Sequence, residues 1–168
     1  MYRKLKLVKI DYKYCDYLRK YDYRVPYNNG KKILRPFVGV LFVVSDKEYF
    51  APLSSPKEKH KTIRNTLDII KIANGSYGII NFNNMIPVMK YNYEIINFDS
   101  KQITKRKELL SNQLRELNKE RGEIYKKSKL LYELYINNRL AKNVKDRCCN
   151  FPLLEEKCKE YNNIKQKV

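Results

Sequence analysis

Apolar and polar positions in the first two-thirds of the chain follow the patterns of short strands. Residues 5–10 alternate apolar and basic side chains, which predicts a strand with one buried face. Residues 37–44 are almost continuously apolar, as in a strand that is buried on both faces. A turn then leads into a partner strand over residues 48–53. Further short strands, separated by turn residues, are expected over residues 67–73, 77–81 and 85–90.

The last third of the chain changes to a helical period. Four apolar residues fall seven positions apart and predict one long helix over residues 101–126; they are Ile103, Leu110, Leu117 and Ile124. A second helix follows through residues 130–135, and a terminal helix over residues 151–161 accepts Pro152 in its first turn. A short amphipathic helix is also expected over residues 12–22.

These elements predict one α+β domain over residues 1–168. Its core is expected to be a small, partly closed β-barrel of short, mainly antiparallel strands, with helices around it and a helical C-terminal third. No run approaches the length of about 18–20 apolar residues that a membrane-spanning helix needs, and the basic start lacks the features of a signal peptide. The four cysteines lack metal-ligand spacing, so we expect reduced thiols in a cytoplasmic protein.

Charge narrows the class of partner. The chain has 36 Lys and Arg against 18 Asp and Glu, a formal net charge of +18. The excess is not confined to a tail, because residues 1–100 and residues 101–168 each carry 18 basic and 9 acidic side chains. A folded body that is basic throughout favours nucleic acid as the partner over a membrane surface.

The missing residue types restrict the chemistry. His60 is the single histidine, which excludes a pair of histidines acting as acid and base within one chain. There is no glycine-rich phosphate loop and no acidic cluster suited to paired magnesium ions, so neither a metal nor another cofactor is expected. Cleavage without a metal points to RNA, whose 2′-hydroxyl can attack the neighbouring phosphate.

The segment from Ala51 to His60 could support that reaction. It combines the hydroxyls of Ser54 and Ser55 with Lys57, Lys59 and His60, directly after a predicted strand. Such groups can bind a phosphate and stabilise charge on it. In the structural alternative, Ser54 or Ser55 simply caps a helix that begins at Pro56.

A basic loop before the long apolar strand is the second candidate. Tyr27, Lys31, Lys32 and Arg35 combine a stacking ring with phosphate-binding charges, which suits single-stranded RNA. The alternative is a solvated surface loop. The charged face of the helix over residues 101–126 is likewise either solvated or a second RNA contact.

Five ordered segments resemble the type III toxin–antitoxin endoribonucleases, the ToxN/AbiQ group. They are Arg24-Val25-Pro26; Arg35-Pro36-Phe37-Val38-Gly39; Ala51 to Lys57 with His60; Gly78-Ile79-Ile80-Asn81 with Met85-Ile86-Pro87; and Cys149-Asn150-Phe151 with residues 153–157. The resemblance implies a compact, kinked β-barrel with helices packed around it. It also implies metal-independent, sequence-selective RNA cleavage that leaves 2′,3′-cyclic phosphate and 5′-hydroxyl ends.

The resemblance also implies partners. The antitoxin of this family is a repeated RNA pseudoknot, which the toxin trims and then binds in a closed toxin–RNA assembly. Other substrates would be cellular or phage RNA, in abortive infection.

The family's catalytic motif falls on Ser54, Ser55 and Lys57 of this chain. Its basic residue before the Phe-x-Gly strand falls on Arg35, and its loop tyrosine on Tyr27. A helix tyrosine of one relative falls on Ser111, which leaves that role without a counterpart. The group that removes the 2′-hydroxyl proton stays open between a lysine and His60.

Three other functions stay open on the sequence. A non-enzymatic RNA-binding protein explains the charge and the tyrosines but not the Ser-Ser-Pro-Lys segment. An RNase toxin with a protein antitoxin shares the barrel but not the five segments. A DNA-binding protein predicts tight binding to duplex DNA.

Overall fold

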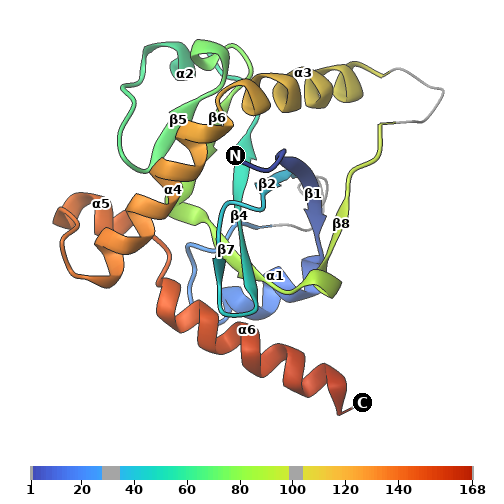
Figure 1. Ribbon diagram of the computed structural model, residues 1–168, viewed down its shortest axis with the longest axis vertical. Helices are drawn as coiled ribbons and strands as arrows, with labels where there is room; N and C mark the ends of the chain where they lie inside the picture. Colours follow the sequence, from blue (N-terminus) through green and yellow to red (C-terminus); the bar gives the residue numbers. More distant parts are fainter. Residues whose placement is uncertain (1, 28–34, 99–103, 168) are drawn as a thin grey trace.

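Eight short strands form one antiparallel sheet at the centre of the molecule (Figure 1). The protein is described by a computed structural model in which residues 2–27, 35–98 and 104–167 are placed. The strands are β1 (Lys6–Ile10), β2 (Phe37–Gly39), β3 (Val43–Val44), β4 (Lys47–Ser54), β5 (Ile69–Lys71), β6 (Ile79–Asn81), β7 (Ile86–Val88) and β8 (Tyr93–Ile95).

The longest strand, β4, organises the sheet. Neighbouring strands follow the order β5-β6-β4-β2-β1-β8, and β3 and β7 also pair with β4. Residues 49–53 of β4 are all buried, because partner strands flank β4 and aromatic side chains of α4 and α6 pack on Tyr49. The α+β class with a mainly antiparallel sheet is therefore confirmed. The barrel is not confirmed, since no pairing among the described residues joins the end strands β5 and β8.

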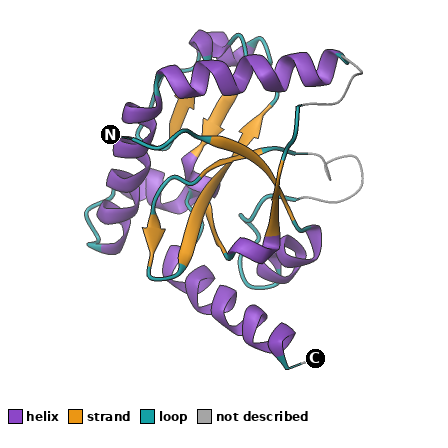
Figure 2. Ribbon diagram, turned by 45° about the vertical axis from the view of Figure 1, so that its right-hand side comes forward, coloured by secondary structure: helices purple, strands orange, loops and turns teal. Residues whose placement is uncertain are grey.

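In the described residues six helices surround the sheet, and four of them, α3 to α6, make up the last third of the chain. They are α1 (Tyr12–Arg19), α2 (Lys59–Thr62), α3 (Lys105–Lys119), α4 (Arg121–Ile136), α5 (Lys142–Arg147) and α6 (Phe151–Gln166). Helix α3 crosses one end of the sheet, α4 runs along its side, and α6 lies at the other end (Figures 1 and 2). Helix α6 packs against β7 and α1, so the C-terminal helix contacts the N-terminal helix.

Two predicted elements are each divided in the structure. The strand expected over residues 37–44 is divided into β2 and β3. Gly39 packs against the ring of Phe50 so closely that a Cβ atom there would lie 2.4 Å from a ring carbon. The chain bends at this contact, although Tyr49 still exchanges backbone hydrogen bonds with residues 41 and 42.

The long helix expected over residues 101–126 ends at Lys119, and α4 begins at Arg121. The physical reason is a competing set of hydrogen bonds at Asn118. Its side chain accepts from the backbone N–H of Leu5 (2.8 Å) and donates to the Leu5 carbonyl (3.2 Å). The guanidinium group of Arg121 also donates to the Asn118 carbonyl, at 2.7 Å. Leu117 and Ile124 remain buried on either side of the break.

One hydrophobic cluster connects the sheet with the helices. Its largest fully buried side chains include Tyr14, Tyr49, Phe50, Phe82 and Phe151. Each fully buried apolar side chain of this size contributes about 1.5–3 kcal/mol. All four cysteines are buried and none forms a disulfide. Within the described ranges, no helix has the length and apolar character needed to cross a membrane.

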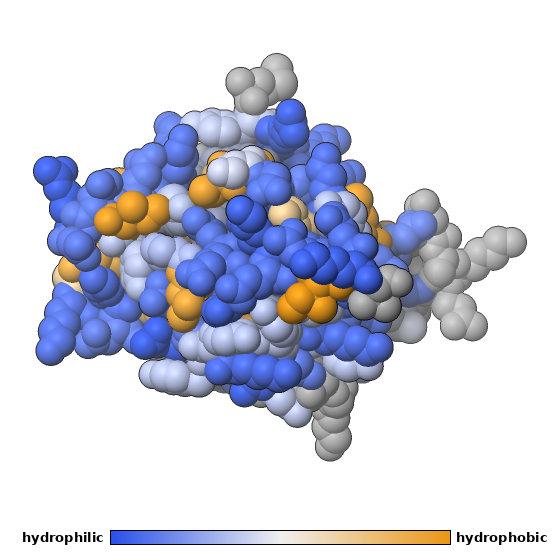
Figure 3. Space-filling model, turned by 90° about the horizontal axis from the view of Figure 1, so that it is seen from below, coloured by the Kyte–Doolittle hydropathy of each residue, from blue (hydrophilic) through white to orange (hydrophobic). Residues whose placement is uncertain are grey.

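The surface is strongly hydrophilic on the side of α6. Seen from below Figure 1, polar and charged side chains cover most of this face, and hydrophobic ones appear as small separate patches (Figure 3). The visible face therefore offers charge rather than a broad apolar surface.

Candidate functional site

The end of β4 carries the segment on which the predicted catalytic residues lie. Ser54 is the last residue of β4 and pairs with Ile79 of β6. On the other side, the backbone N–H of Leu53 donates to the carbonyl of Pro36 at 3.0 Å. Because Phe37 pairs with Pro52, continuing this antiparallel register puts Arg35 opposite Ser54. Two candidates that are 19 positions apart in the sequence thus become neighbours.

Two glycines hold the loop that follows Ser54. Gly78 has φ +92°, and a Cβ atom on it would lie 1.9 Å from the Ser54 carbonyl oxygen. Gly75 has φ +91°, and a Cβ atom there would lie 2.3 Å from the His60 carbonyl oxygen. Both positions need a left-handed backbone and an absent side chain. The loop between Ser54 and His60 therefore lies directly on the backbone of residues 75–78.

A glutamine of α3 fixes the far side of this support. Gln113 is buried and donates from Nε2 to the carbonyl of Tyr77 at 2.8 Å. This bond joins the helical third of the chain to the loop between β5 and β6. The candidate loop is consequently supported by elements from both halves of the molecule.

His60 closes the loop from inside. Its side chain is 2% exposed, and Nδ1 accepts the backbone N–H of Lys57 at 3.1 Å. Its own backbone N–H donates to the Lys57 carbonyl at 2.9 Å. Burial, with smaller contributions from Lys57 and Lys59, lowers the pKa of the imidazole below its ordinary value. A neutral ring fits this geometry, because an acceptor nitrogen carries no proton.

The two serines occupy different environments. The Ser54 hydroxyl accepts from Asn81 Nδ2 at 2.8 Å, whereas Ser55 is exposed. Neither caps a helix: α2 begins at Lys59, its N-cap is Glu58, and no side-chain cap bond is formed. The structural alternative of a serine cap on a helix from Pro56 is therefore wrong.

The loop presents a hydroxyl and two ammonium groups to solvent. Ser55, Lys57 and Lys59 are all exposed. Glu58, which lies between the two lysines, pairs with Lys61 at 3.2 Å. Among the described residues, no side chain binds the Ser55 hydroxyl or the Lys57 ammonium group. These groups remain available for an anionic ligand.

The other predicted RNA contacts are only partly described. Tyr27 is exposed, and the guanidinium carbon of Arg19 lies 4.5 Å from its ring centroid. Arg35 is half-buried, and burial lowers the pKa of its guanidinium group. Lys31 and Lys32 lie outside the described residues. The strand register therefore puts the backbone of Arg35 opposite Ser54, and Tyr27 lies against Arg19 of α1.

Sequence reasoning assigned no role to four residues that position this loop together with His60. Asn81 and the Gly75–Gly78 pair support it, and Gln113 anchors the support. Gly78 and Asn81 lie in one of the five segments that resemble the ToxN/AbiQ group, and this resemblance was the only feature of the sequence that marked them. Within residues 2–27, 35–98 and 104–167, no three His, Cys, Asp or Glu side chains gather as a set of metal ligands.

Comparisons with known proteins relate nearly the whole chain to one family. A family described as "Toxin ToxN, type III toxin-antitoxin system" matches residues 6–159. "Endoribonuclease ToxN" of Bacillus thuringiensis subsp. kurstaki is 31% identical over 163 residues, which cover 94% of this chain and 84% of that protein. "Endoribonuclease ToxN" of Pectobacterium atrosepticum is 29% identical over 165 residues, which cover 94% of each chain.

Solved structures agree with this assignment. One described as "A processed non-coding RNA regulates a bacterial antiviral system" has a TM-score of 0.80 and 28% identity, covering 92% of this chain and 98% of its own. A second concerns "selective toxin inhibition by a non-coding RNA pseudoknot" and has a TM-score of 0.82 and 29% identity, covering 95% and 99%.

A third solved structure supports the fold alone. It is the lactococcal anti-phage endoribonuclease AbiQ, with a TM-score of 0.83 and 24% identity over 96% of this chain and 99% of its own. The family match covers most of the chain, including the serine–lysine loop and its supports. The chain therefore belongs to the ToxN family of type III toxin–antitoxin toxins.

Proposed function

We propose that this protein is an endoribonuclease toxin that cleaves RNA without a metal ion. In this reaction the ribose 2′-hydroxyl attacks the adjacent phosphorus, and the bond from phosphorus to the 5′-oxygen of the next nucleotide breaks. The products are a 2′,3′-cyclic phosphate and a 5′-hydroxyl end. The observation that carries the proposal is the exposed Ser55 and Lys57 on a loop held by buried positioning residues.

Lys57 is proposed to stabilise the phosphate as negative charge develops on it. The backbone of Lys57 is held by His60, so its ammonium group needs only a side-chain rotation to reach the phosphate. Stabilisation of developing charge is commonly the largest catalytic contribution. Ser55 would orient a phosphate oxygen through its hydroxyl. Ser54, already bonded to Asn81, supports the loop beneath them.

The surrounding residues would bind the flanking RNA. Arg35 stands opposite Ser54 in the strand register and supplies a planar, bidentate donor for a phosphate. Tyr27, with Arg19 beside its ring, supplies a stacking surface for a base, and Lys59 adds charge next to Lys57. His60 is assigned a positioning role, because its ring is buried and its Nδ1 already binds the Lys57 backbone.

The partners follow from family membership. We propose that a repeated RNA pseudoknot is the antitoxin, that the toxin processes it, and that the two assemble into a closed complex. The named relatives act as endoribonucleases, and one solved structure reports inhibition by an RNA pseudoknot. Cellular or phage RNA in the cytoplasm would be the target when the antitoxin is lost. Cleavage of that RNA would abort the phage infection.

One cleavage experiment tests the proposal. Purified protein, freed of bound nucleic acid, is incubated with mixed RNA in excess EDTA, and the product ends are mapped. We expect defined cuts with cyclic-phosphate and 5′-hydroxyl ends. Lys57→Ala should lower the rate by about 10²-fold or more, the usual effect of losing one group that stabilises developing charge.

A matched variant keeps the result interpretable. Lys129→Ala removes an exposed lysine on α4 and should leave the cleavage rate unchanged. Circular dichroism checks that both variants are folded. Intact RNA that remains tightly bound would instead favour the non-enzymatic RNA-binding alternative. Cleavage by folded Lys57→Ala at the wild-type rate would exclude the assigned role of Lys57.

A further inference from the structure

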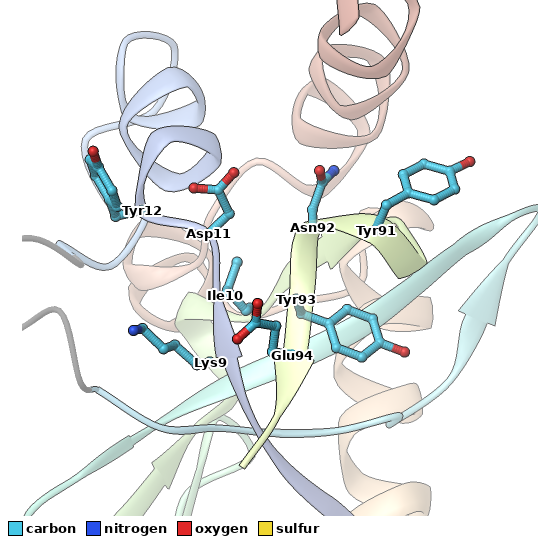
Figure 4. A pocket seen from close by; sticks show the side chains of 8 residues that line it. All are labelled: Lys9, Ile10, Asp11, Tyr12, Tyr91, Asn92, Tyr93 and Glu94. Carbon is cyan, nitrogen blue, oxygen red and sulfur yellow. The ribbon is translucent and has the colours of Figure 1, made fainter. Parts of the chain in front are cut away.

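A pocket of about 300 Å³ opens between β1, β8 and the start of α1. Lys9 pairs with Glu94, and Ile10 with Tyr93, so the two strands form its floor. Asp11 donates its backbone N–H to the Asn92 carbonyl at 2.8 Å, which closes the wall beside α1. Figure 4 shows Tyr12 and Tyr91 on opposite sides of the pocket, with Lys9 and Glu94 beside each other. The pocket lies at the sheet edge, because β8 is an end strand.

Three of the lining residues make hydrogen bonds that stabilise the fold. The Tyr93 hydroxyl donates to Glu48 at 2.6 Å. Asp11 accepts the backbone N–H of Lys13 at 3.0 Å and thereby caps α1. Asn92 is buried and donates to Asn162 at 3.0 Å. These contacts explain the frame of the pocket.

The side chains of four other lining residues make no such stabilising contacts among the described residues. Among the described residues, no hydrogen bond, ion pair or ring contact involves the side chains of Lys9, Tyr12, Tyr91 or Glu94. Tyr91 is 70% exposed and Tyr12 40% exposed, although tyrosine normally buries its ring. These four side chains are therefore available to a ligand that enters the pocket.

This set of groups matches one nucleotide of single-stranded RNA. Unstacked bases bind to aromatic rings and to polar groups along their hydrogen-bonding edges. A carboxylate accepts the amino groups of bases, and a lysine binds the phosphate. The volume is at the lower end of the range for small-molecule sites, which suits a single nucleotide. Exposed Lys13 and Lys90, next to the two tyrosines in sequence, add charge for neighbouring phosphates.

We propose that this pocket binds one unpaired base of a bound RNA, at a place separate from the cleavage loop. The proposal rests on RNA as the ligand of the proposed function. Strand β2 lies between β1 and β4, so the pocket and the serine–lysine loop belong to different parts of the sheet. An RNA held at both sites is aligned along the protein rather than gripped at the scissile phosphate alone.

Glu94 determines which base the pocket prefers. Guanine has two adjacent donors, N1–H and the 2-amino group, which match the two oxygens of one carboxylate. Uracil has a single N3–H between two carbonyl oxygens, which the carboxylate repels. We therefore expect guanine to bind better than uracil, and Tyr91 to stack on either base.

The test measures binding without cleavage. Fluorescein-labelled 2′-O-methyl oligonucleotides cannot react, because their 2′-oxygen is blocked. Full-length protein, freed of bound nucleic acid, is titrated with a twelve-nucleotide uridine oligomer and with the same oligomer carrying one guanosine, and anisotropy gives each Kd. The ratio of the two Kd values cancels general electrostatic effects.

Three variants give the expected pattern. Wild type should favour the guanosine oligomer by at least about fivefold, and Glu94→Gln should bring the ratio close to one. Tyr91→Ala should weaken binding of both oligomers by at least about fivefold, which is the low end of the effect of losing one stacking ring. Tyr91→Phe keeps the ring and should bind both oligomers as wild type does. Glu133→Gln on α4, the matched loss of an exposed carboxylate, should leave the ratio unchanged.

Two results would overturn the proposal. The first is a base preference that is the same in Glu94→Gln as in wild type. The second is unchanged affinity in Tyr91→Ala, which would identify the pocket as a solvated surface groove. Neither depends on catalysis, whereas failure of the proposed function appears in the EDTA assay as uncut natural RNA. The two failures are therefore distinguishable.

Discussion

Replacing Gly78 with alanine tests whether the serine–lysine loop depends on the backbone beneath it. At φ +92°, a residue other than glycine costs about 1–3 kcal/mol in backbone strain. The new Cβ atom would also lie 1.9 Å from the Ser54 carbonyl oxygen, and relieving such overpacking costs about 1–3 kcal/mol. The sum, about 2–6 kcal/mol, is a large part of the roughly 5–15 kcal/mol that stabilises a typical protein.

Activity should fall by more than stability alone explains. To relieve the contact, the Ser54 backbone must move by roughly 1 Å, and Ser55 and Lys57 follow it. A displacement of about that size can lower an enzymatic rate about 10²-fold. Urea unfolding measures the loss of stability, and single-turnover RNA cleavage at low temperature measures the rate of the folded variant.

Gly122→Ala is the matched control. A Cβ atom at Gly122 would meet only the ring of Tyr2, at 3.2 Å, and the residue lies in the first turn of α4. Alanine there should be neutral or should stabilise the helix by up to about 1 kcal/mol. If Gly78→Ala is as stable and as active as Gly122→Ala, the loop is not positioned by its contact with Gly78.

Three further predictions follow from charges and buried pairs. The pKa of His60 is lowered below the ordinary 6.5, so the unfolded chain binds more protons just below that pH. The stability that neutral His60 contributes should therefore be complete above pH 6.5 and decline below it, by up to about 1.4 kcal/mol per pH unit. Urea unfolding between pH 7 and 5 should show a shallower decline in His60→Asn; equal slopes would refute the reasoning. Arg147→Ala should lower the free energy of unfolding by about 3 kcal/mol, because it leaves the fully buried carboxylate of Asp68 without its partner. This is the low end for a broken buried pair, since the Arg147 side chain is 43% exposed. Arg115→Ala should lower the free energy of unfolding much less than Arg147→Ala does, because solvent screens this surface pair and Glu116 keeps Lys119 as a partner. RNA affinity measured by anisotropy should fall by about 10³-fold or more between 50 and 200 mM salt, because several phosphates are neutralised together; a flat salt dependence would contradict it.

Local sequence patterns predicted the elements that bury an apolar face. The alternation over residues 5–10 and the helical spacing over residues 12–22 and 151–161 correspond to β1, α1 and α6. Patterns failed where burial is small. Helix α5 has no buried residue among Lys142–Arg147, and the edge strand β8 exposes Glu94 and Ile95, so neither leaves a periodic apolar signal. The break between α3 and α4 was also missed, because it depends on hydrogen bonds between Asn118 and the distant Leu5.

The sequence by itself determined the excess of positive charge, the serine–lysine segment after a strand, and the family to which that segment belongs. These are properties of residue type and order, which need no knowledge of distant contacts. Only the tertiary structure decided how the segment is held. Gly75, Gly78, Asn81 and Gln113 act through backbone approach and hydrogen bonds from other elements. The tertiary structure likewise decided that Lys9 and Tyr12 share a pocket with Tyr91 and Glu94, because strand pairing joins positions about 80 residues apart.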